Sequence, residues 1–160
     1  EELNIKPEQV LPFSTGVIGQ LLPVDSIEKN ANKLVNSLTE DGLGNVAKGI
    51  LTTDLVEKYC SVSFKVDGVK VNLSGVAKGS GMIRPNMATM LSFIVTDIGA
   101  SQDELQQCLD ISVSQSFNRI TVDGDTSTND ACTLSATNQS GILYSQCKEA
   151  FQKALNELTK

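Results

Sequence analysis

A threonine that follows an alanine is the residue in this sequence best suited to covalent chemistry. Ala88 is followed by Thr89, and an apolar run begins at Met90. The Thr89 hydroxyl can attack the Ala88 carbonyl carbon, giving an ester that water can cleave. The freed α-amino group of Thr89, with a pKa of about 7.7–8.0, can then act as a general base for the same residue's hydroxyl. The pair is therefore a candidate site of self-cleavage, although Ala-Thr dipeptides are common.

The absence of histidine narrows the chemistry further. It excludes Ser-His-Asp and Cys-His catalysis within the chain, so a hydroxyl nucleophile needs another base. The cysteines form no CxxC pair, which argues against the common zinc sites, and we expect no metal and no cofactor. We expect buried free thiols, with a disulfide as the open alternative. The four cysteines are Cys60, Cys108, Cys132 and Cys147.

Two glycine-containing loops are further candidates for a binding site. Gly79 and Gly81 follow Lys78, and such a loop either cradles a phosphate or simply joins two strands. It is not a P-loop, because GxxxxGK[ST] is absent. The stretch 13–19 contains Thr15-Gly16, and its glycines predict a tight loop with exposed backbone amides.

The N-terminal half is expected to position these loops with two helices and a hairpin. Asp25 and Glu28 form a capping-box pattern, and Gly42 is placed to end the helix. Residues 45–51 predict a short second helix, and residues 60–77 predict a hairpin that turns at Asp67-Gly68. The apolar stripe of the first helix consists of Ile27, Ala31, Leu34, Val35 and Leu38.

The C-terminal half is expected to alternate strands and helices. Residues 90–96 predict a strand covered on both faces, Ser101 and Glu104 predict a capped helix to about 116, and a last helix begins near Ser145. Residues 119–123 and 131–137 predict strands around a polar loop. The inner helical faces carry Leu105, Cys108, Leu109 and Ser112, then Cys147, Phe151, Ala154, Leu155 and Leu158. The order predicts an α/β (α+β) class with layered sheets flanked by helices, in one domain, 1–160.

Composition excludes several classes of partner. The 160 residues carry a net charge of −6 and no run of lysine or arginine, which argues against nucleic acid. No stretch reaches 18 apolar residues, so we expect no membrane span. The acidic, polar start does not look like a secretory signal, and we expect a cytoplasmic protein.

Four motifs give the chain a family resemblance. They are STGVIG at 14–19, TTD at 52–54, KGSGMIRPNMATMLSFIVTD at 78–97 and DGDTSTND at 123–130. In this order they resemble the ornithine acetyltransferase family, the bifunctional glutamate N-acetyltransferases of arginine biosynthesis. The similarity covers essentially the whole chain.

The resemblance implies a fold, a reaction and residue roles. The fold would be the ornithine acetyltransferase, or DmpA-like, fold. The reaction would move an acetyl group from N-acetylornithine to glutamate by a ping-pong route. Thr89 would be the nucleophile and the first residue after cleavage behind Ala88, and Thr15 and Gly16 would form the oxyanion hole. Thr52, Lys78 and Thr89 would contact substrate, and Lys78 suits a substrate carboxylate.

Each assigned residue also has a simpler interpretation. Thr15-Gly16 can be only a turn, and Lys78 can be a solvated surface lysine. Thr52 can end a helix, with Thr53 as a neighbouring competitor for its role. The loop 123–130 can be a cation site, but it lacks the later glutamate of an EF-hand. We therefore expect a hydrogen-bonded structural loop there.

The chain also departs from the family pattern. Family members extend further at both ends, so we expect a partial domain, incomplete at both ends, with only part of the substrate pocket. Arg84 stands where a smaller residue is expected. Missing sheet edges would expose apolar surface, which leaves dimerisation or another oligomer, or aggregation, as open outcomes. The alternatives are a catalytically inactive remnant that acts only as a folded or oligomerising domain, and an amide hydrolase.

Overall fold

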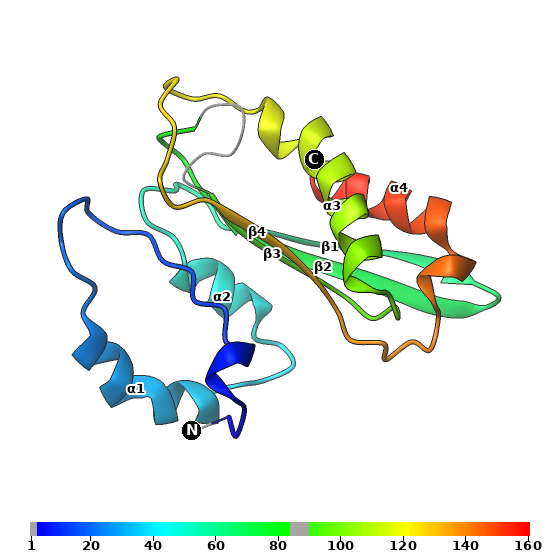
Figure 1. The fold of residues 1–160 in the computed structure, drawn as a ribbon, viewed down its shortest axis with the longest axis horizontal. Coiled ribbons are helices and arrows are strands. Elements are labelled where there is room, and N and C mark those ends of the chain that lie inside the picture. The colour runs from blue at the N-terminus through cyan, green and yellow to red at the C-terminus, as the bar shows by residue number, and fades with distance from the viewer. Residues whose placement is uncertain (1–2, 84–89) are drawn as a thin grey trace.

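A computed structural model of the chain describes residues 3–83 and 90–160. It confirms the predicted mixture of helices and strands, with helices packed against one four-stranded sheet (Figure 1). The predicted cleavage pair, Ala88-Thr89, and the unexpected Arg84 lie outside the described residues. The elements are α1 Val24–Asn36, α2 Leu43–Gly49, β1 Lys58–Val66, β2 Val69–Lys78, β3 Leu91–Thr96, α3 Gln102–Gln115, β4 Ala131–Ala136 and α4 Lys148–Leu158, with 3₁₀ turns at Pro7–Gln9, Phe117–Arg119 and Tyr144–Gln146.

The sheet has the strand order β1-β2-β3-β4. The pairs β1–β2 and β2–β3 are antiparallel. Strand β4 runs parallel to β3, and α3 lies in the connection between them. The predicted hairpin is confirmed. Its turn residues Asp67 and Gly68 have φ of 49° and 86°, the paired positive values of a turn that matches the strand twist.

The strand predicted at 119–123 is wrong. A 3₁₀ turn, Phe117–Arg119, ends the segment after α3, and bends follow it. The amide of Val122 donates to the Ile83 carbonyl oxygen at 2.7 Å instead of joining a strand ladder. Ile120 and Val122 are 46% and 58% exposed, so alternation of apolar residues here did not reflect a buried face.

One face of the sheet is covered by α3 and α4 (Figure 1). The Ser101 capping box is confirmed, because the Ser101 hydroxyl accepts from the Glu104 amide and the Glu104 carboxylate accepts from the Ser101 amide. The predicted inner faces are confirmed in the main, with Leu105 and Leu158 only partly buried. The core comprises Val71, Leu73, Ile94, Ile98, Cys108, Leu109, Val113, Ile142, Cys147, Phe151, Ala154 and Leu155.

The cysteines follow the expected pattern with one exception. All four are free, Cys108 and Cys147 are buried, and Cys132 is partly buried. Cys60 on β1 is exposed, against the expectation of buried thiols, because it lies on the edge strand of the sheet.

The other face of the sheet is covered in part by α2 and the N-terminal segment. Ala47 of α2 is fully buried, and the ring of Phe13 packs edge-on against Phe93 of β3 with centroids 5.5 Å apart. The first helix begins after Pro23 with no side-chain cap, so the predicted Asp25 capping box is wrong.

The predicted end of the first helix is also wrong. The backbone amide and the hydroxyl of Ser37 both donate to the Leu34 carbonyl oxygen, and α1 ends there. Gly42 is the N-cap residue of α2, which begins at Leu43. The stripe of α1 is not buried as predicted, since Leu34 and Leu38 are 60% and 73% exposed.

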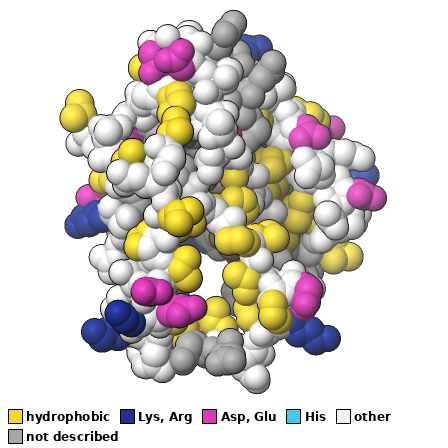
Figure 2. Space-filling model, turned by 60° about the vertical axis from the view of Figure 1, so that its left-hand side comes forward, with side chains coloured by type: hydrophobic (Ala, Val, Ile, Leu, Met, Phe, Trp, Pro, Cys, Tyr) yellow, Lys and Arg dark blue, Asp and Glu magenta, His cyan; other side chains and the backbone are white. Residues whose placement is uncertain are grey.

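An apolar groove lies between these helices and the sheet. It has a volume of about 1170 Å³ and is lined by the 34–50 region together with β1, β2 and β3. Figure 2 shows hydrophobic side chains gathered around a hollow. Val95 is 45% exposed in this groove, so the prediction that β3 is covered on both faces is wrong at that residue.

Candidate functional site

The centre of the candidate site is the end of the sheet where β2 stops and β3 starts. Lys78, the last residue of β2, pairs in register with Leu91, the first residue of β3. Leu91 follows Thr89 by two positions in the sequence. The strand pairing therefore places the motif lysine next to the start of the segment that follows the predicted nucleophile.

Lys78 is a buried lysine, so its interpretation as a solvated surface residue is wrong. Only 2% of it is exposed. Burial lowers the pKa of Lys78, because the charged ammonium loses hydration. The carboxylates of Asp54 and Asp130 act in the opposite direction and offset part of that effect. The site thus contains a buried lysine that is influenced electrostatically by two acidic side chains from different loops.

Asp54 connects the TTD motif to the end of β2. Its side chain is fully buried, and it accepts from the Lys58 ammonium and, at 2.8 Å, from the Gly79 amide. Burial acts to raise the pKa of Asp54, but the Lys58 ammonium and the Gly79 and Thr52 amides outweigh it and leave the pKa below its usual value. Its atom Oδ2 is buried without a hydrogen-bond partner among the described residues.

The two threonines of this motif differ in their contacts. Thr53 Oγ1 and Ser80 Oγ lie 2.6 Å apart, so the Thr53 hydroxyl ties the turn to the loop after β2. Thr52 is exposed, and its backbone amide helps to hold the Asp54 carboxylate. Thr53 thus makes a structural contact, and both threonines are exposed.

Thr15 and Gly16 line a cleft whose described lining does not include Lys78 or Thr52. The cleft has a volume of about 660 Å³ and is lined by residues 14–22, Val24, Met82 and residues 127–129. The Asn129 side-chain amide donates to the Ser14 carbonyl oxygen at 3.2 Å and links the two motifs directly. The STGVIG and DGDTSTND motifs are therefore in contact, although Ser14 and Asn129 are 115 positions apart in the sequence.

The loop 123–130 is fixed by hydrogen bonds, which confirms its interpretation as a structural loop. Asp123 accepts from the amides of Met82 and Ile83, and Asp130 accepts from the Met90 amide at 2.8 Å. The Met82 amide contributes most to lowering the pKa of Asp123. Burial raises the pKa of Asp130, and the Met90 amide and Lys78 offset part of that rise. In the described part of the chain no cluster of three or more acidic or cysteine side chains is suited to a metal.

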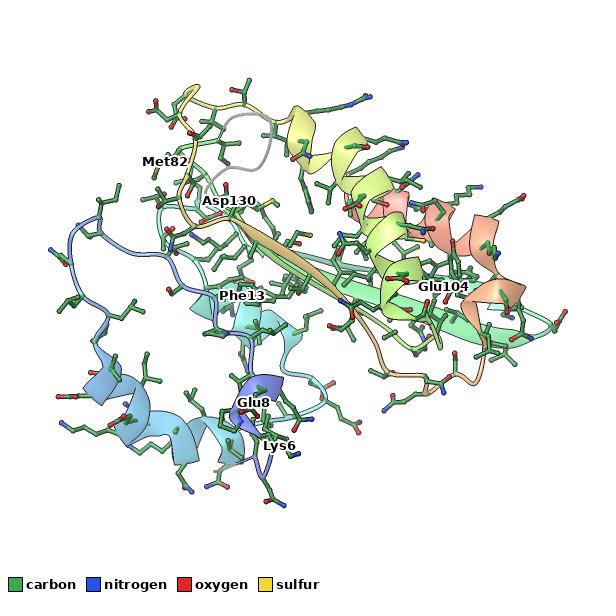
Figure 3. The ribbon with its side chains drawn as sticks, in the orientation of Figure 1. Lys6, Glu8, Phe13, Met82, Glu104 and Asp130 are labelled. Atoms are coloured by element: carbon green, nitrogen blue, oxygen red, sulfur yellow. The ribbon has the colours of Figure 1, made fainter. Side chains whose placement is uncertain are left out.

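Asp54, Asp123 and Asp130 are site residues whose roles do not follow from the sequence. Each is a motif aspartate, and their contacts bring the TTD, KGSGMI and DGDTSTND motifs together. Figure 3 shows Met82 and Asp130 in the same region, near the end of β2 and the start of β4. In the sequence these aspartates are marked only by their position at the ends of motifs. That position does not identify a hydrogen-bond partner 40 residues away.

Known proteins of one family are similar to this chain over nearly its whole length. The ArgJ family model matches residues 1–160. The arginine biosynthesis bifunctional protein ArgJ of Desulfotalea psychrophila is 49% identical over 97% of this chain and 40% of its own length. The same protein of Pseudomonas fluorescens is 48% identical over 89% of this chain and 35% of its own length. The glutamate N-acetyltransferase of Methanococcus maripaludis is 45% identical over 100% of this chain and 40% of its own length.

The chain thus spans about two fifths of the length of these relatives, between 35% and 40%. Within residues 3–83 and 90–160, none of the helices has the length and apolar character needed to cross a membrane.

Proposed function

Because the chain belongs to the ArgJ family, we propose that it carries the nucleophile and part of the substrate site of an enzyme that transfers an acetyl group from N-acetylornithine to glutamate. The observation that carries the proposal is the burial of Lys78 at the point where β2 pairs with the residue two positions after Thr89. A lysine ammonium is costly to bury, so its retention beside this segment supports a role in binding a negatively charged group.

The first step of the proposed chemistry is self-cleavage. The Thr89 Oγ attacks the Ala88 carbonyl carbon, the peptide C–N bond breaks, and the hydroxyl proton ends on the freed amine. Water then hydrolyses the ester, which releases the Ala88 carboxylate and restores the Thr89 hydroxyl. The product has a free α-amino group on Thr89, which supplies the base that the missing histidine cannot.

The second step is acetyl transfer. The Thr89 Oγ attacks the acetyl carbonyl of N-acetylornithine while the Thr89 amine takes its proton and delivers it to the departing ornithine amine. The amine of glutamate then attacks the acetyl ester, and the Thr89 hydroxyl is restored. Thr15 and Gly16 would donate to the oxyanion in both halves. Their place in one cleft with residues of the 123–130 loop supports that role.

The substrate contacts are assigned to Lys78 and Thr52. Both substrates carry a carboxylate, and an ion pair with Lys78 would be stronger in a site shielded from water. Thr52 lies on the turn whose Asp54 is bound to the residue after Lys78, so the turn and the lysine are held together. No cofactor is needed for either step.

Intact mass spectrometry of the purified chain tests the proposal. We expect the chain to split into fragments 1–88 and 89–160, and N-acetylornithine to add one acetyl group to the second fragment. Added glutamate should remove that group as N-acetylglutamate. Thr89→Ala should stay whole, and Thr89→Ser should retain slower cleavage. A chain that stays whole and takes up no acetyl group contradicts the proposal, and loss of the acetyl group as acetate without glutamate indicates a hydrolase.

One observation favours a second function. The groove between α1, α2 and the sheet is lined by exposed leucine and valine side chains. An exposed apolar surface of this kind favours a domain that oligomerises and has no catalytic activity. Concentration-dependent sedimentation of an uncleaved, unacetylated chain would support this alternative. An acetylated 89–160 fragment would exclude it as the whole function.

A further inference from the structure

One loop holds the residues on both sides of the undescribed segment 84–89. On the upstream side, Asp123 accepts from the Met82 amide and, at 3.0 Å through Oδ1, from the Ile83 amide. The neighbouring amide of Val122 donates to the Ile83 carbonyl oxygen at 2.7 Å. Ile83 is therefore bound through both its N–H and its C=O, and its side chain is almost fully buried, with 9% exposed.

The downstream side has the same arrangement. Asp130 Oδ1 accepts from the Met90 amide at 2.8 Å, and the amide of Ala131 donates to the Met90 carbonyl oxygen at 3.0 Å. Each end of the segment is thus held by one aspartate carboxylate and one backbone amide. We call these contacts of residues 122–123 and 130–131 with residues 82–83 and 90 the clamp. Met82 and Asp130 are labelled in Figure 3.

The clamp encloses the predicted cleavage bond in the sequence, since Ala88-Thr89 lies between Ile83 and Met90. An acyl shift from nitrogen to oxygen needs a peptide that its surroundings hold in an unfavourable geometry, and fixed ends supply that constraint. Hydrogen bonds to an ionised carboxylate are stronger than neutral ones, so the two aspartates are the contacts that hold the ends most firmly.

We propose that Asp123 and Asp130 are positioning residues with different duties: Asp123 serves chiefly self-cleavage, and Asp130 serves both self-cleavage and acetyl transfer. The inference rests on the proposed function. Cleavage leaves Ile83 on the fragment that ends at Ala88, so its contact with Asp123 is no longer joined covalently to the nucleophile. Met90 stays bonded to Thr89, so its contact with Asp130 acts one residue from the nucleophile throughout both steps.

The position of Asp130 explains its longer role. It is partly buried, contacts the Met90 amide and interacts with the Lys78 ammonium, so it joins the nucleophilic strand to the substrate-binding lysine. Asp123 is exposed and interacts chiefly with backbone amides of residues 82–83 and 125. The two ends of one loop therefore differ in what they touch.

The test compares Asp123→Asn and Asp130→Asn with Asp125→Asn, an exposed aspartate of the same loop. The rate of splitting is followed by intact mass, and each variant is then left until split before its acetylation by N-acetylornithine is timed. We expect D123N to split about tenfold more slowly and then to acetylate within about threefold of the wild-type rate, because Met82, which Asp123 binds, also lines the Thr15–Gly16 cleft. D130N should slow both reactions about tenfold or more, and D125N neither.

A separate readout reports the contacts themselves. In a Thr89→Ala background, which cannot split, D123N should speed amide hydrogen exchange at residues 82–83 and leave Met90 protected. D130N should have the reverse effect. Melting temperatures of all variants identify any general loss of folding.

The outcomes separate the two proposals. A wild-type chain that never splits overturns the proposed function and the division of duties with it. A wild-type chain that splits while D123N splits equally fast overturns the inference alone. D123N that slows cleavage and acetylation by the same factor also overturns it, because a merely structural aspartate would affect both reactions alike.

Discussion

The assignment of Thr15 and Gly16 as oxyanion donors makes a sharp prediction, because one would donate from its side chain and the other from its backbone. Thr15→Ala removes the hydroxyl, whereas Gly16→Ala keeps the amide. An alanine methyl group at Gly16 meets no atom within 4 Å, and Gly16 does not have a left-handed φ. The two substitutions are therefore matched in size and position but differ in what they remove.

The expected magnitude follows from the loss of one donor. Removing an oxyanion-hole donor costs about 2.7–4 kcal/mol of transition-state stabilisation, which is about 10²–10³ in rate. We expect T15A to slow acetylation of the 89–160 fragment by that factor and G16A to change it by less than about threefold. Thr15 is half-buried and Gly16 exposed, so each should change the free energy of unfolding by no more than about 0.5 kcal/mol.

The assay is single-turnover acetylation by N-acetylornithine, followed by intact mass, on chains that have been allowed to split completely. Thermal melting provides the control, and a shift of more than about 2 °C would indicate a folding defect. If T15A and G16A acetylate at the same rate, the Thr15 hydroxyl is not an oxyanion donor. If G16A is the slower of the two, the open space at Gly16 accommodates substrate instead.

Three further predictions concern the residues that support the site. Lys78→Met should abolish acetylation and change the melting temperature at neutral pH only slightly, because relief from burying the ammonium offsets the weaker contact of Asp130 with Met90. The pKa of Asp54 is lowered from its usual 3.8, so its carboxylate stabilises the fold above about pH 3.8. That contribution to the free energy of unfolding is lost as the pH falls through the lowered pKa. Urea unfolding of Asp54→Asn should not show this loss. Gly75→Val places its Cβ 2.9 Å from the Leu158 side chain and should cost about 1–3 kcal/mol, lowering the melting temperature by about 2–12 °C, and Leu158→Ala in the same chain should restore part of it.

Local sequence signals predicted the elements whose stability is decided locally. The hairpin follows from two alternating runs around Asp67-Gly68, and both turn residues adopt the positive φ that this pair tolerates. The third helix follows from the reciprocal bonds of Ser101 and Glu104. In each case the determining contacts join residues at most a few positions apart.

The errors arose where distant residues decide the outcome. Alternation at 119–123 resembled a strand, but no neighbouring strand pairs with it, and Val122 bonds to Ile83 instead. The stripe of α1 has helical spacing, yet spacing does not say what will cover it, and Leu38 is largely exposed. For Lys78 the error has the opposite sign. A lysine is usually a surface residue, and only the assembled fold shows that this one is buried.

The site residues show the same division between motif and contact. The family motifs identified Thr15, Thr52 and Lys78 as candidates, but the aspartates that connect them emerged only from the structure. Asp54 joins the TTD turn to the residue after Lys78, and Asp130 joins Lys78 to the strand that follows Thr89. A motif identifies the types of residue in a site. Hydrogen bonds between residues 25 or 40 positions apart in the sequence can be recognised only once the fold is known.

Under the proposed function, these contacts couple self-cleavage to the later reaction. Asp130 binds the Met90 amide and interacts with Lys78, so the position of the nucleophilic strand and the charge of the substrate pocket depend on the same side chain. Burial raises the pKa of Asp130, and Lys78 offsets part of that rise, so neutralising Lys78 should favour protonation of Asp130 and weaken its hold on Met90. Lys78→Met is therefore expected to slow self-cleavage as well as to abolish acetylation. A K78M chain that splits at the wild-type rate but takes up no acetyl group would show that the lysine serves the substrate alone.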